Sequence, residues 1–115
     1  MVSAGPYVPQ RGDFVWLDFD PQAGHEQAGR RPALVLSPAS YNRPTRLALF
    51  CPVTSRVKGY AFEVAVTGAK RVAGVVLADQ VKTLDWSKRN AAFIERSDPE
   101  VVEDVLAKLM TLTEY

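Results

Sequence analysis

The stretch DFVWLDF, residues 13–19, shows the alternation on which the fold of this chain depends. Apolar residues stand at every second position from Val15 to Phe19, while Trp16 and Asp18 fall on the other side. Because successive side chains of a strand point to opposite faces, this pattern predicts a strand with one face in the core. The second face carries a mixture of residue types and is expected to be only partly buried.

Short apolar runs separated by glycine, proline, asparagine and serine continue along the chain and indicate more strands. The segment SYNRPTR, residues 40–46, interrupts them and is predicted to be a turn or a single helical turn. The further strand candidates are residues 32–38, 47–53, 61–67, 74–78 and 91–96.

From Asp98 onward the apolar residues follow the i, i+3, i+4 spacing of an amphipathic helix. Asp98 can cap this helix with Pro99 at its first position. Alternatively, Ser97 caps it and Glu100 completes a capping box. We predict one helix over about residues 98–113. Its apolar positions are Val101, Val102, Val105, Leu106, Leu109, Met110 and Leu112.

Five to seven short strands followed by one helix indicate a mainly β protein whose helix packs on a small, strongly bent sheet. We expect an SH3-like β-barrel over about residues 10–96, within a single domain of residues 1–115.

The composition is that of a globular protein, with 47% hydrophobic and 23% charged residues. No apolar stretch approaches the roughly 18 to 20 residues that cross a bilayer. The N-terminal segment lacks the basic and apolar regions of a secretory signal, and Cys51 is the only cysteine. These features predict a cytoplasmic protein that does not associate with membranes.

Charge is uneven along the chain, although the net charge is only +1. Residues 98–115 contain five acidic residues and one basic residue, so the first 97 residues hold 13 basic and 8 acidic residues. A basic excess of this size fits a face for a polyanion, yet it is also common on ordinary protein surfaces.

Several chemical motifs are missing from the sequence. There is no CxxC or HExxH pattern, which argues against a zinc site, and no GxGxxG or GxxxxGK[ST] pattern, which argues against dinucleotide and P-loop sites. A nucleophilic Cys–His pair would need Cys51 and His25. Cys51 lies in an apolar run and is expected in the core, and His25 lies in a glycine-flanked loop and is expected to be solvated.

Residues 20–38, DPQAGHEQAGRRPALVLSP, place Glu26, Arg30 and Arg31 in what would otherwise be a simple connection. Pro32 favours an extended conformation in the residue before it, so Arg31 would leave from the entry to a strand. There its guanidinium can fork onto phosphate oxygens. The other interpretation is a surface ion pair between Glu26 and one arginine. Judged from this segment alone, the ion pair is slightly favoured over phosphate binding.

A second polar cluster, PVTSRVKGY at residues 52–60, places hydroxyl groups and bases directly after an apolar strand. Such groups at a strand end can bind phosphate, but they also occur in plain turns. Aromatic side chains near the polar segments can stack on unpaired bases. They are Trp16, Tyr41, Tyr60 and Trp86. For the two tryptophans, packing in the core is the favoured role.

Three ordered stretches carry a family resemblance over about residues 7–96. They are GDFVWLDFDPQAGHEQAGRRPALVLSP, VTSRVKGYAFEV and GVVLADQVKTLDW. In this order they resemble the motifs of the MazF family, also called PemK-like or Kid-like, of toxin endoribonucleases from bacterial toxin–antitoxin pairs. The resemblance implies a small barrel of the CcdB/PemK type and a nuclease that acts on RNA.

The resemblance also implies roles for individual residues. Arg31 matches the arginine taken to act on the scissile phosphate, as general acid or charge stabiliser, and Thr54 matches a threonine that contacts the same phosphate. Glu26 matches a loop glutamate that accepts a proton or organises the loop. For Asp79 and Gln80, strand-end packing and dimer contact are preferred over catalysis. RNA contact is expected for Trp16, His25, Gln27, Arg30, Ser55, Arg56, Lys58 and Lys82.

The implied reaction needs no metal and no cofactor. The 2′-hydroxyl of the RNA attacks the adjacent phosphorus and gives a 2′,3′-cyclic phosphate and a 5′-hydroxyl end, while the protein aligns the groups, stabilises charge and moves two protons. Because an arginine stays protonated at any working pH, charge stabilisation is the preferred role of Arg31.

The resemblance further implies sequence-specific cleavage of single-stranded mRNA, which inhibits translation, by a homodimer. A cognate acidic antitoxin of the MazE type, partly disordered, would cover the RNA groove.

Two alternatives are kept. A CcdB-like toxin on the same fold would inhibit DNA gyrase through protein contact at the end of the C-terminal helix. The ending MTLTEY lacks the tryptophan-containing tail expected for that contact. A plain SH3-like binding module would leave Glu26, Arg31 and Thr54 without a joint purpose. The endoribonuclease is therefore the preferred function.

Overall fold

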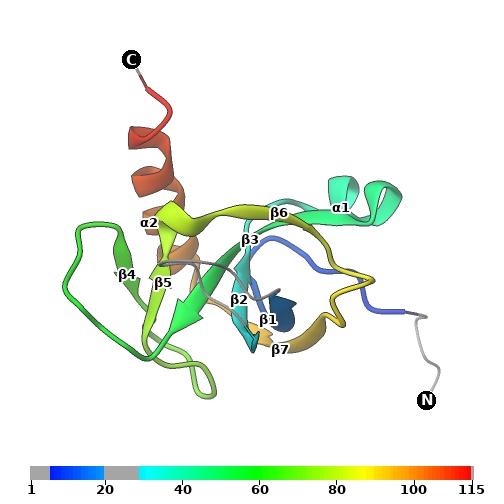
Figure 1. The fold of residues 1–115 in the computed structure, drawn as a ribbon, viewed down its shortest axis with the longest axis horizontal. Coiled ribbons are helices and arrows are strands. Elements are labelled where there is room, and N and C mark those ends of the chain that lie inside the picture. Colours follow the sequence, from blue (N-terminus) through cyan, green and yellow to red (C-terminus); the bar gives the residue numbers. More distant parts are fainter. Residues whose placement is uncertain (1–5, 20–28, 115) are drawn as a thin grey trace.

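The computed structural model describes residues 6–19 and 29–114 of the chain. Within these residues seven strands, a long C-terminal helix and two short helices are formed (Figure 1). The strands are β1 (Asp13–Phe19), β2 (Gly29–Val35), β3 (Leu47–Thr54), β4 (Glu63–Ala65), β5 (Val75–Leu77), β6 (Lys82–Asp85) and β7 (Ala92–Arg96). The helices are α1 (Ala39–Thr45), the 3₁₀ helix η1 (Ala78–Gln80) and α2 (Pro99–Thr111).

The strands form one antiparallel sheet in the order β4-β5-β3-β2-β1-β7, with β6 as a second partner of β3. The first half of β3, residues 47–50, pairs with β6, whereas Val53 and Thr54 pair with β5. The sheet bends through β3 because this strand changes partners midway. The expected mainly β fold with a C-terminal helix is confirmed. In the described part of the chain, however, no pairing joins β4 to β7, so the barrel is not closed.

Two apolar clusters form on opposite sides of the central strands. In β1 one face is buried and the other only partly, as its alternation predicts. The helix-side core contains Phe14, Leu34, Leu36, Cys51, Val53, Val64, Val72, Val76, Ala78, Ile94, Val101, Val102 and Val105. The tryptophan core contains Val15, Leu17, Phe19, Ala33, Val35, Ala48, Phe50 and Trp86. The three central strands β1, β2 and β3 therefore contribute alternate residues to both cores.

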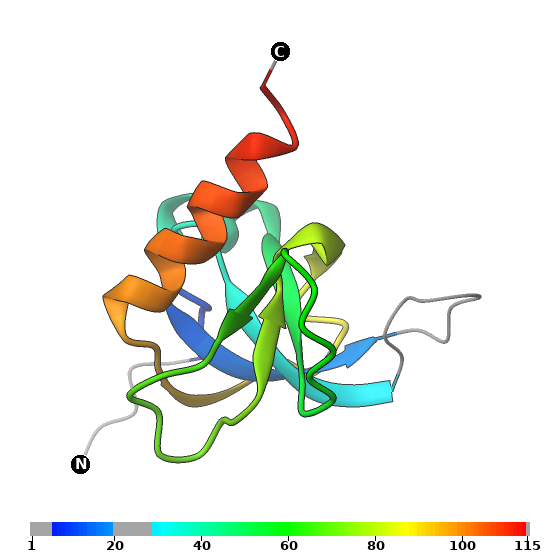
Figure 2. The same ribbon diagram turned by 90° about the vertical axis from the view of Figure 1, so that its left-hand side faces the viewer.

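Helix α2 covers the helix-side core and runs diagonally across one side of the sheet beside β4 (Figure 2). Its buried stripe consists of Val101, Val102 and Val105, as the spacing predicts. Of the two expected caps, the structure has Asp98 with Pro99 in the first turn, and its carboxylate makes no capping hydrogen bond. Across the described residues, no helix has the length and apolar character required to span a membrane.

Four segments differ from the sequence-based expectation. Strand β2 spans Gly29–Val35, three residues earlier than the predicted 32–38. Residues 39–45 form the seven-residue helix α1, which is longer than the predicted turn or single helical turn, because its buried Asn42 is bonded to Pro9 and Trp86 outside the helix. Strand β6 was not expected, since Leu84 is the only strongly apolar residue in its sequence KTLD. Strand β4 is shorter than the predicted 61–67.

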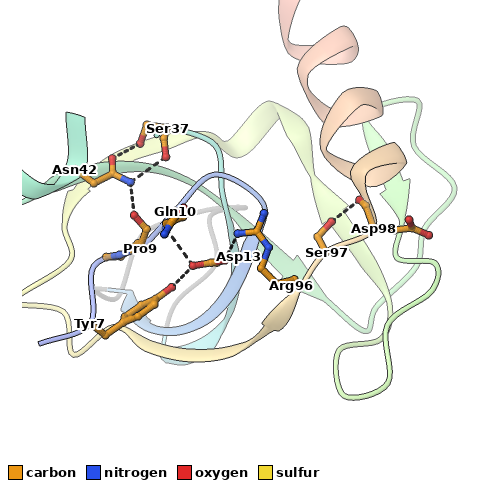
Figure 3. A network of polar contacts seen from close by, with 9 residues as sticks. All are labelled: Tyr7, Pro9, Gln10, Asp13, Ser37, Asn42, Arg96, Ser97 and Asp98. Carbon is orange, nitrogen blue, oxygen red and sulfur yellow. Dashed lines mark hydrogen bonds and ion pairs between the residues drawn. The ribbon is translucent and has the colours of Figure 1, made fainter. Parts of the chain in front are cut away.

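A buried carboxylate joins the N-terminal segment to the sheet (Figure 3). Asp13 accepts hydrogen bonds from the Tyr7 hydroxyl, from the backbone N–H of Gln10 at 3.1 Å and from the Arg96 guanidinium at 2.8 Å. These donors come from the N-terminal segment and from β7, so the Gly-Asp pair that opens the first sequence motif has a structural function.

Candidate active site

Arg31 lies in the exposed first half of β2, where the strand extends beyond the tryptophan core. Its cross-strand partner on β1 is Leu17. Along β2 it shares a face with Ala33 and Val35, which are fully buried, while Arg31 itself is only partly buried. The extended conformation expected before Pro32 is thus present, and the arginine stands at the rim of a packed core.

The register of β2 and β3 relates Arg31 to Thr54. The last paired residues are Ala33 and Pro52. Continued by two residues, this antiparallel register sets Arg31 opposite Thr54, and opposite residues project from the same face of a sheet. A guanidinium and a hydroxyl from distant parts of the sequence therefore lie on one face, just beyond the same end of the paired part of β2 and β3.

Thr54 also starts the connection to β4, which we call the basic loop (residues 55–61). Its Oγ1 accepts a hydrogen bond from the backbone N–H of Arg56 at 3.1 Å, so its O–H proton is left to donate elsewhere. Arg56 and Lys58 are exposed, and the Lys58 ammonium lies 5.8 Å from the centre of the Tyr60 ring. Tyr60 is 64% exposed. The loop thus carries Ser55 and both cations on the surface next to Thr54.

Lys82 lies on the same face but farther from Arg31. It begins β6 and pairs with Phe50, which shares its face with Pro52 and Thr54. Thr54 lies four positions after Phe50 in β3, a distance of about 13 Å along a strand. The lysine can therefore belong to an extended binding surface around Thr54.

Trp16 and Arg30 lie on the opposite face of β1 and β2. Trp16 pairs with Pro32 and is 39% exposed, so its expected place in the core is wrong. Arg30 faces Asp18 and forms an ion pair with it at 2.9 Å, with both side chains 41% exposed. Hydrogen bonds from Asn90 and then Arg30 lower the pKa of Asp18 below its ordinary value.

The core assignments of two other residues are confirmed. Trp86 is buried in the tryptophan core, and its Nε1 donates to the carbonyl of Asn42 at 2.9 Å. Cys51 is fully buried, and burial, followed by the charge of Asp79, raises the pKa of its thiol to about 12. A thiol in this environment is not an activated nucleophile.

Part of the predicted site lies outside the described residues. It comprises His25, Glu26 and Gln27, and with them the ion pair expected between Glu26 and an arginine. Asp79 and Gln80 belong to η1, which follows β5 and lies against α2, but Ala78 is its buried residue; Asp79 is exposed and Gln80 is partly buried, so the packing expected for Asp79 is not seen. Over residues 6–19 and 29–114, no group of three or more His, Cys, Asp or Glu side chains could hold a metal ion.

Two residues near the site were not singled out from the sequence. Glu63 accepts hydrogen bonds from the backbone of the basic loop, and Gly74 lies against the carbonyl of Thr54. The signal for Gly74 was available, because a lone glycine at the start of an apolar run can mark close backbone approach. Glu63 looked like an ordinary exposed position of a strand.

The arrangement offers an open surface with a cation and a hydroxyl on one face and two further cations in the adjacent loop. Such groups can neutralise and orient a phosphodiester. The shallow depression lined by Arg11, Arg96 and the start of α2 lies at the other end of β1 and shares no residue with this surface.

Known proteins similar to this chain agree with that chemistry. Residues 10–113 match the family described as PemK-like, MazF-like toxin of type II toxin–antitoxin system. The chain is 49% identical to the endoribonuclease toxin MazF of Escherichia coli K12 over 106 residues, which cover 92% of this chain and 95% of the relative.

Solved structures of similar proteins have the same fold. The crystal structure of MazF from Deinococcus radiodurans superimposes with a TM-score of 0.89 at 55% identity, covering 94% of this chain and 98% of the other. MazF in a MazE–MazF crystal structure from the same organism gives 0.84 at 55% identity, covering 94% and 97%. The chain therefore belongs to the PemK-like, MazF-like family of toxins of type II toxin–antitoxin systems.

Proposed function

We propose that this endoribonuclease toxin cleaves single-stranded RNA on the face of the sheet that carries Arg31 and Thr54. The β2–β3 register supports the proposal, because its continuation brings both side chains to one strand end. Relatives named as endoribonucleases match over nearly the whole chain, the E. coli MazF at 49% identity. The proposed substrate is messenger RNA, and its cleavage would inhibit translation.

The proposed reaction uses a nucleophile within the RNA. The 2′-oxygen forms a bond to the adjacent phosphorus while the bond from phosphorus to the 5′-oxygen breaks. A 2′,3′-cyclic phosphate and a 5′-hydroxyl end result. The 2′-hydroxyl loses a proton to Glu26, the leaving 5′-oxygen gains one from water, and the hydroxide so formed takes the proton from Glu26, which restores both groups.

Arg31 and Thr54 act on the phosphate in this scheme. Arg31 stabilises the charge that the pentacovalent phosphorus gains, and Thr54 donates a hydrogen bond to a phosphate oxygen. Removing one such donor typically slows an enzyme by about 10²–10³-fold. The scheme assigns no step to a metal ion.

The RNA strand would extend from this point over the basic loop. Ser55, Arg56 and Lys58 lie beside Thr54, and Lys82 continues the same face along β3. Trp16 and Arg30 offer a stacking surface and a cation on the other face of β1 and β2, and His25 and Gln27 belong to the connection between these strands. Several well-separated contacts of this kind allow sequence to be read from unpaired bases.

A cognate antitoxin is proposed as the second partner. MazE–MazF complexes of Deinococcus radiodurans contain a toxin of the same fold at 55% identity. An acidic antitoxin segment and RNA are both anions, so both suit the basic loop. We further propose a homodimer acting in the cytoplasm, where messenger RNA is translated.

Inhibition of DNA gyrase is set aside as the alternative. The family match and the relatives are endoribonuclease toxins of the MazF and PemK type.

The test is cleavage of a long, unstructured RNA by the purified protein in EDTA, with the cut sites mapped by primer extension. We expect a few defined cuts that leave 5′-hydroxyl ends, and a loss of about 10²–10³-fold in rate for Arg31→Ala with the fold intact. A requirement for magnesium, or an Arg31→Ala protein that cuts at the full rate, contradicts the mechanism.

A further inference from the structure

Glu63, the first residue of β4, holds the basic loop through its carboxylate. Its Oε1 accepts the backbone N–H of Gly59 at 2.9 Å, and its two oxygens accept the N–H of Lys58 at 3.3 and 3.1 Å. The backbone N–H of Glu63 donates in turn to the carbonyl of Tyr60 at 3.1 Å. Side chain and backbone of one residue thus close the turn at residues 58–60.

The loop has little else to fix its shape. It contains no regular secondary structure, and Gly59 has a φ of +82°, which turns the chain sharply. The other anchors are at its ends: Thr54 accepts the N–H of Arg56, and Lys108 of α2 donates to the carbonyl of Ala61 at 2.7 Å. The middle of the loop, which carries both Lys58 and Tyr60, is held by Glu63.

We propose that Glu63 is a positioning residue for RNA binding: it fixes the basic loop so that Arg56, Lys58 and Tyr60 are already placed beside Thr54 when RNA arrives. This inference rests on the proposed function of the Arg31–Thr54 face. A loop that is ordered before binding loses less conformational entropy in the complex, and the gain appears as affinity.

The negative charge of Glu63 makes the two possible roles predict opposite changes in RNA affinity. As a plain surface charge, a carboxylate beside two cations repels phosphate and weakens RNA binding. Removing it would then tighten the complex. If the carboxylate acts by ordering the loop, its removal weakens the complex in spite of the lost repulsion.

The chain supplies a matched control. Glu95 on β7 accepts backbone N–H bonds from Lys70, Arg71 and Val72 at 3.0, 2.6 and 2.9 Å. It therefore holds a loop with a carboxylate in the same way. That loop packs on the helix-side core through Val72, on the opposite side of the sheet from Arg31 and Thr54.

The experiment compares Glu63→Gln and Glu95→Gln with the parent protein in EDTA. For Glu63→Gln we expect KM for RNA to rise roughly tenfold while kcat stays within about twofold. For Glu95→Gln we expect the KM of the parent protein. Gly59→Ala strains the same turn without changing its charge, because the φ of +82° is unfavourable for a residue with a side chain. The added Cβ meets no atom within 4 Å, so no clash complicates the comparison, and KM should also rise.

An unchanged or lower KM for Glu63→Gln, or an equal rise for Glu95→Gln, overturns the proposal. Binding of a fluorescein-labelled oligodeoxyuridine, which lacks the reacting 2′-hydroxyl, gives a second readout, and Glu63→Gln should weaken it by a similar factor. A parent protein that binds this probe but does not cut RNA refutes the proposed cleavage mechanism. A Glu63→Gln protein that binds the probe as well as the parent refutes the role of Glu63.

Discussion

Replacing Gly74 with alanine tests whether the position of Thr54 depends on close backbone packing. Gly74 has a φ of +112°, and a Cβ added there would lie 2.1 Å from the carbonyl oxygen of Thr54 and 3.0 Å from the Cα of Ser55. Both of these neighbours are backbone atoms that no side-chain rotation can remove. To reach an ordinary contact near 3.5 Å, the end of β3 must therefore move by roughly 1.4 Å.

The expected loss of stability follows from two contributions. The backbone conformation at Gly74 costs about 1–3 kcal/mol for a residue with a side chain. Because only two residue pairs join β3 to β5, moving Thr54 also weakens backbone hydrogen bonds worth about 1 kcal/mol each. We expect Gly74→Ala to lower the free energy of unfolding by about 3–5 kcal/mol. Gly59→Ala, with a positive φ and no contact, should lose only about 1–2 kcal/mol.

Activity should fall more than stability explains. A displacement of about 1 Å in a catalytic group can lower kcat by about 10²-fold. The assays are urea unfolding and RNA cleavage at saturating substrate, at a temperature where both variants are folded. If Gly74→Ala unfolds like Gly59→Ala and retains the kcat of the parent protein, the close packing of Gly74 on Thr54 does not position the active site.

Three other perturbations test further parts of the structure. Hydrogen bonds from the backbone of Lys70, Arg71 and Val72 lower the pKa of Glu95 below its ordinary 4.5. The ionised carboxylate therefore stabilises the folded protein fully above pH 4.5, and this contribution is lost as the pH falls through the lower pKa of the folded state. Urea midpoints should therefore fall less between neutral and acidic pH in Glu95→Gln than in the parent, and identical slopes would refute this role. Tyr7→Phe removes a donor to buried Asp13 and should lower the unfolding free energy by about 1.5–3 kcal/mol at unchanged kcat; a cost below about 0.5 kcal/mol would contradict the network. The thiol of Cys51 should react with a thiol reagent only after urea unfolds the chain, and rapid labelling of the folded protein would show that it is accessible.

Strong local patterns made the fold largely predictable. The alternation in residues 13–19 gave β1 with its observed bounds, and the spacing after Asp98 gave α2. Prediction failed where distant contacts decide the local structure. Residues 39–45 form a helix longer than the predicted turn or single helical turn, because Asn42 binds Pro9 and Ser37 and its carbonyl accepts the Trp86 N–H, contacts that no local pattern contains.

The site was less predictable than the fold. Composition and spacing allowed two roles for Arg31, a surface ion pair or binding of a phosphate. The family resemblance favoured phosphate binding. The placement of Arg31 and Thr54 on one face beyond the same end of β2 and β3 depends on the register of these strands, which the sequence alone does not specify. The two tryptophans illustrate the same limit: Trp86 is buried against α1, whereas Trp16 faces outward across from Pro32.

The contribution of β3 to both cores also constrains how proteins of this fold can change. Thr54 points toward the Arg31 side because it lies an even number of positions, four, after Phe50 in the tryptophan core. An insertion or deletion of one residue between them would turn the hydroxyl toward α2 and disrupt both cores together. The basic loop has no alternating burial pattern that fixes its number of residues. Divergence in RNA target should therefore arise through changes of length and composition in this loop, while the number of residues along β3 stays constant.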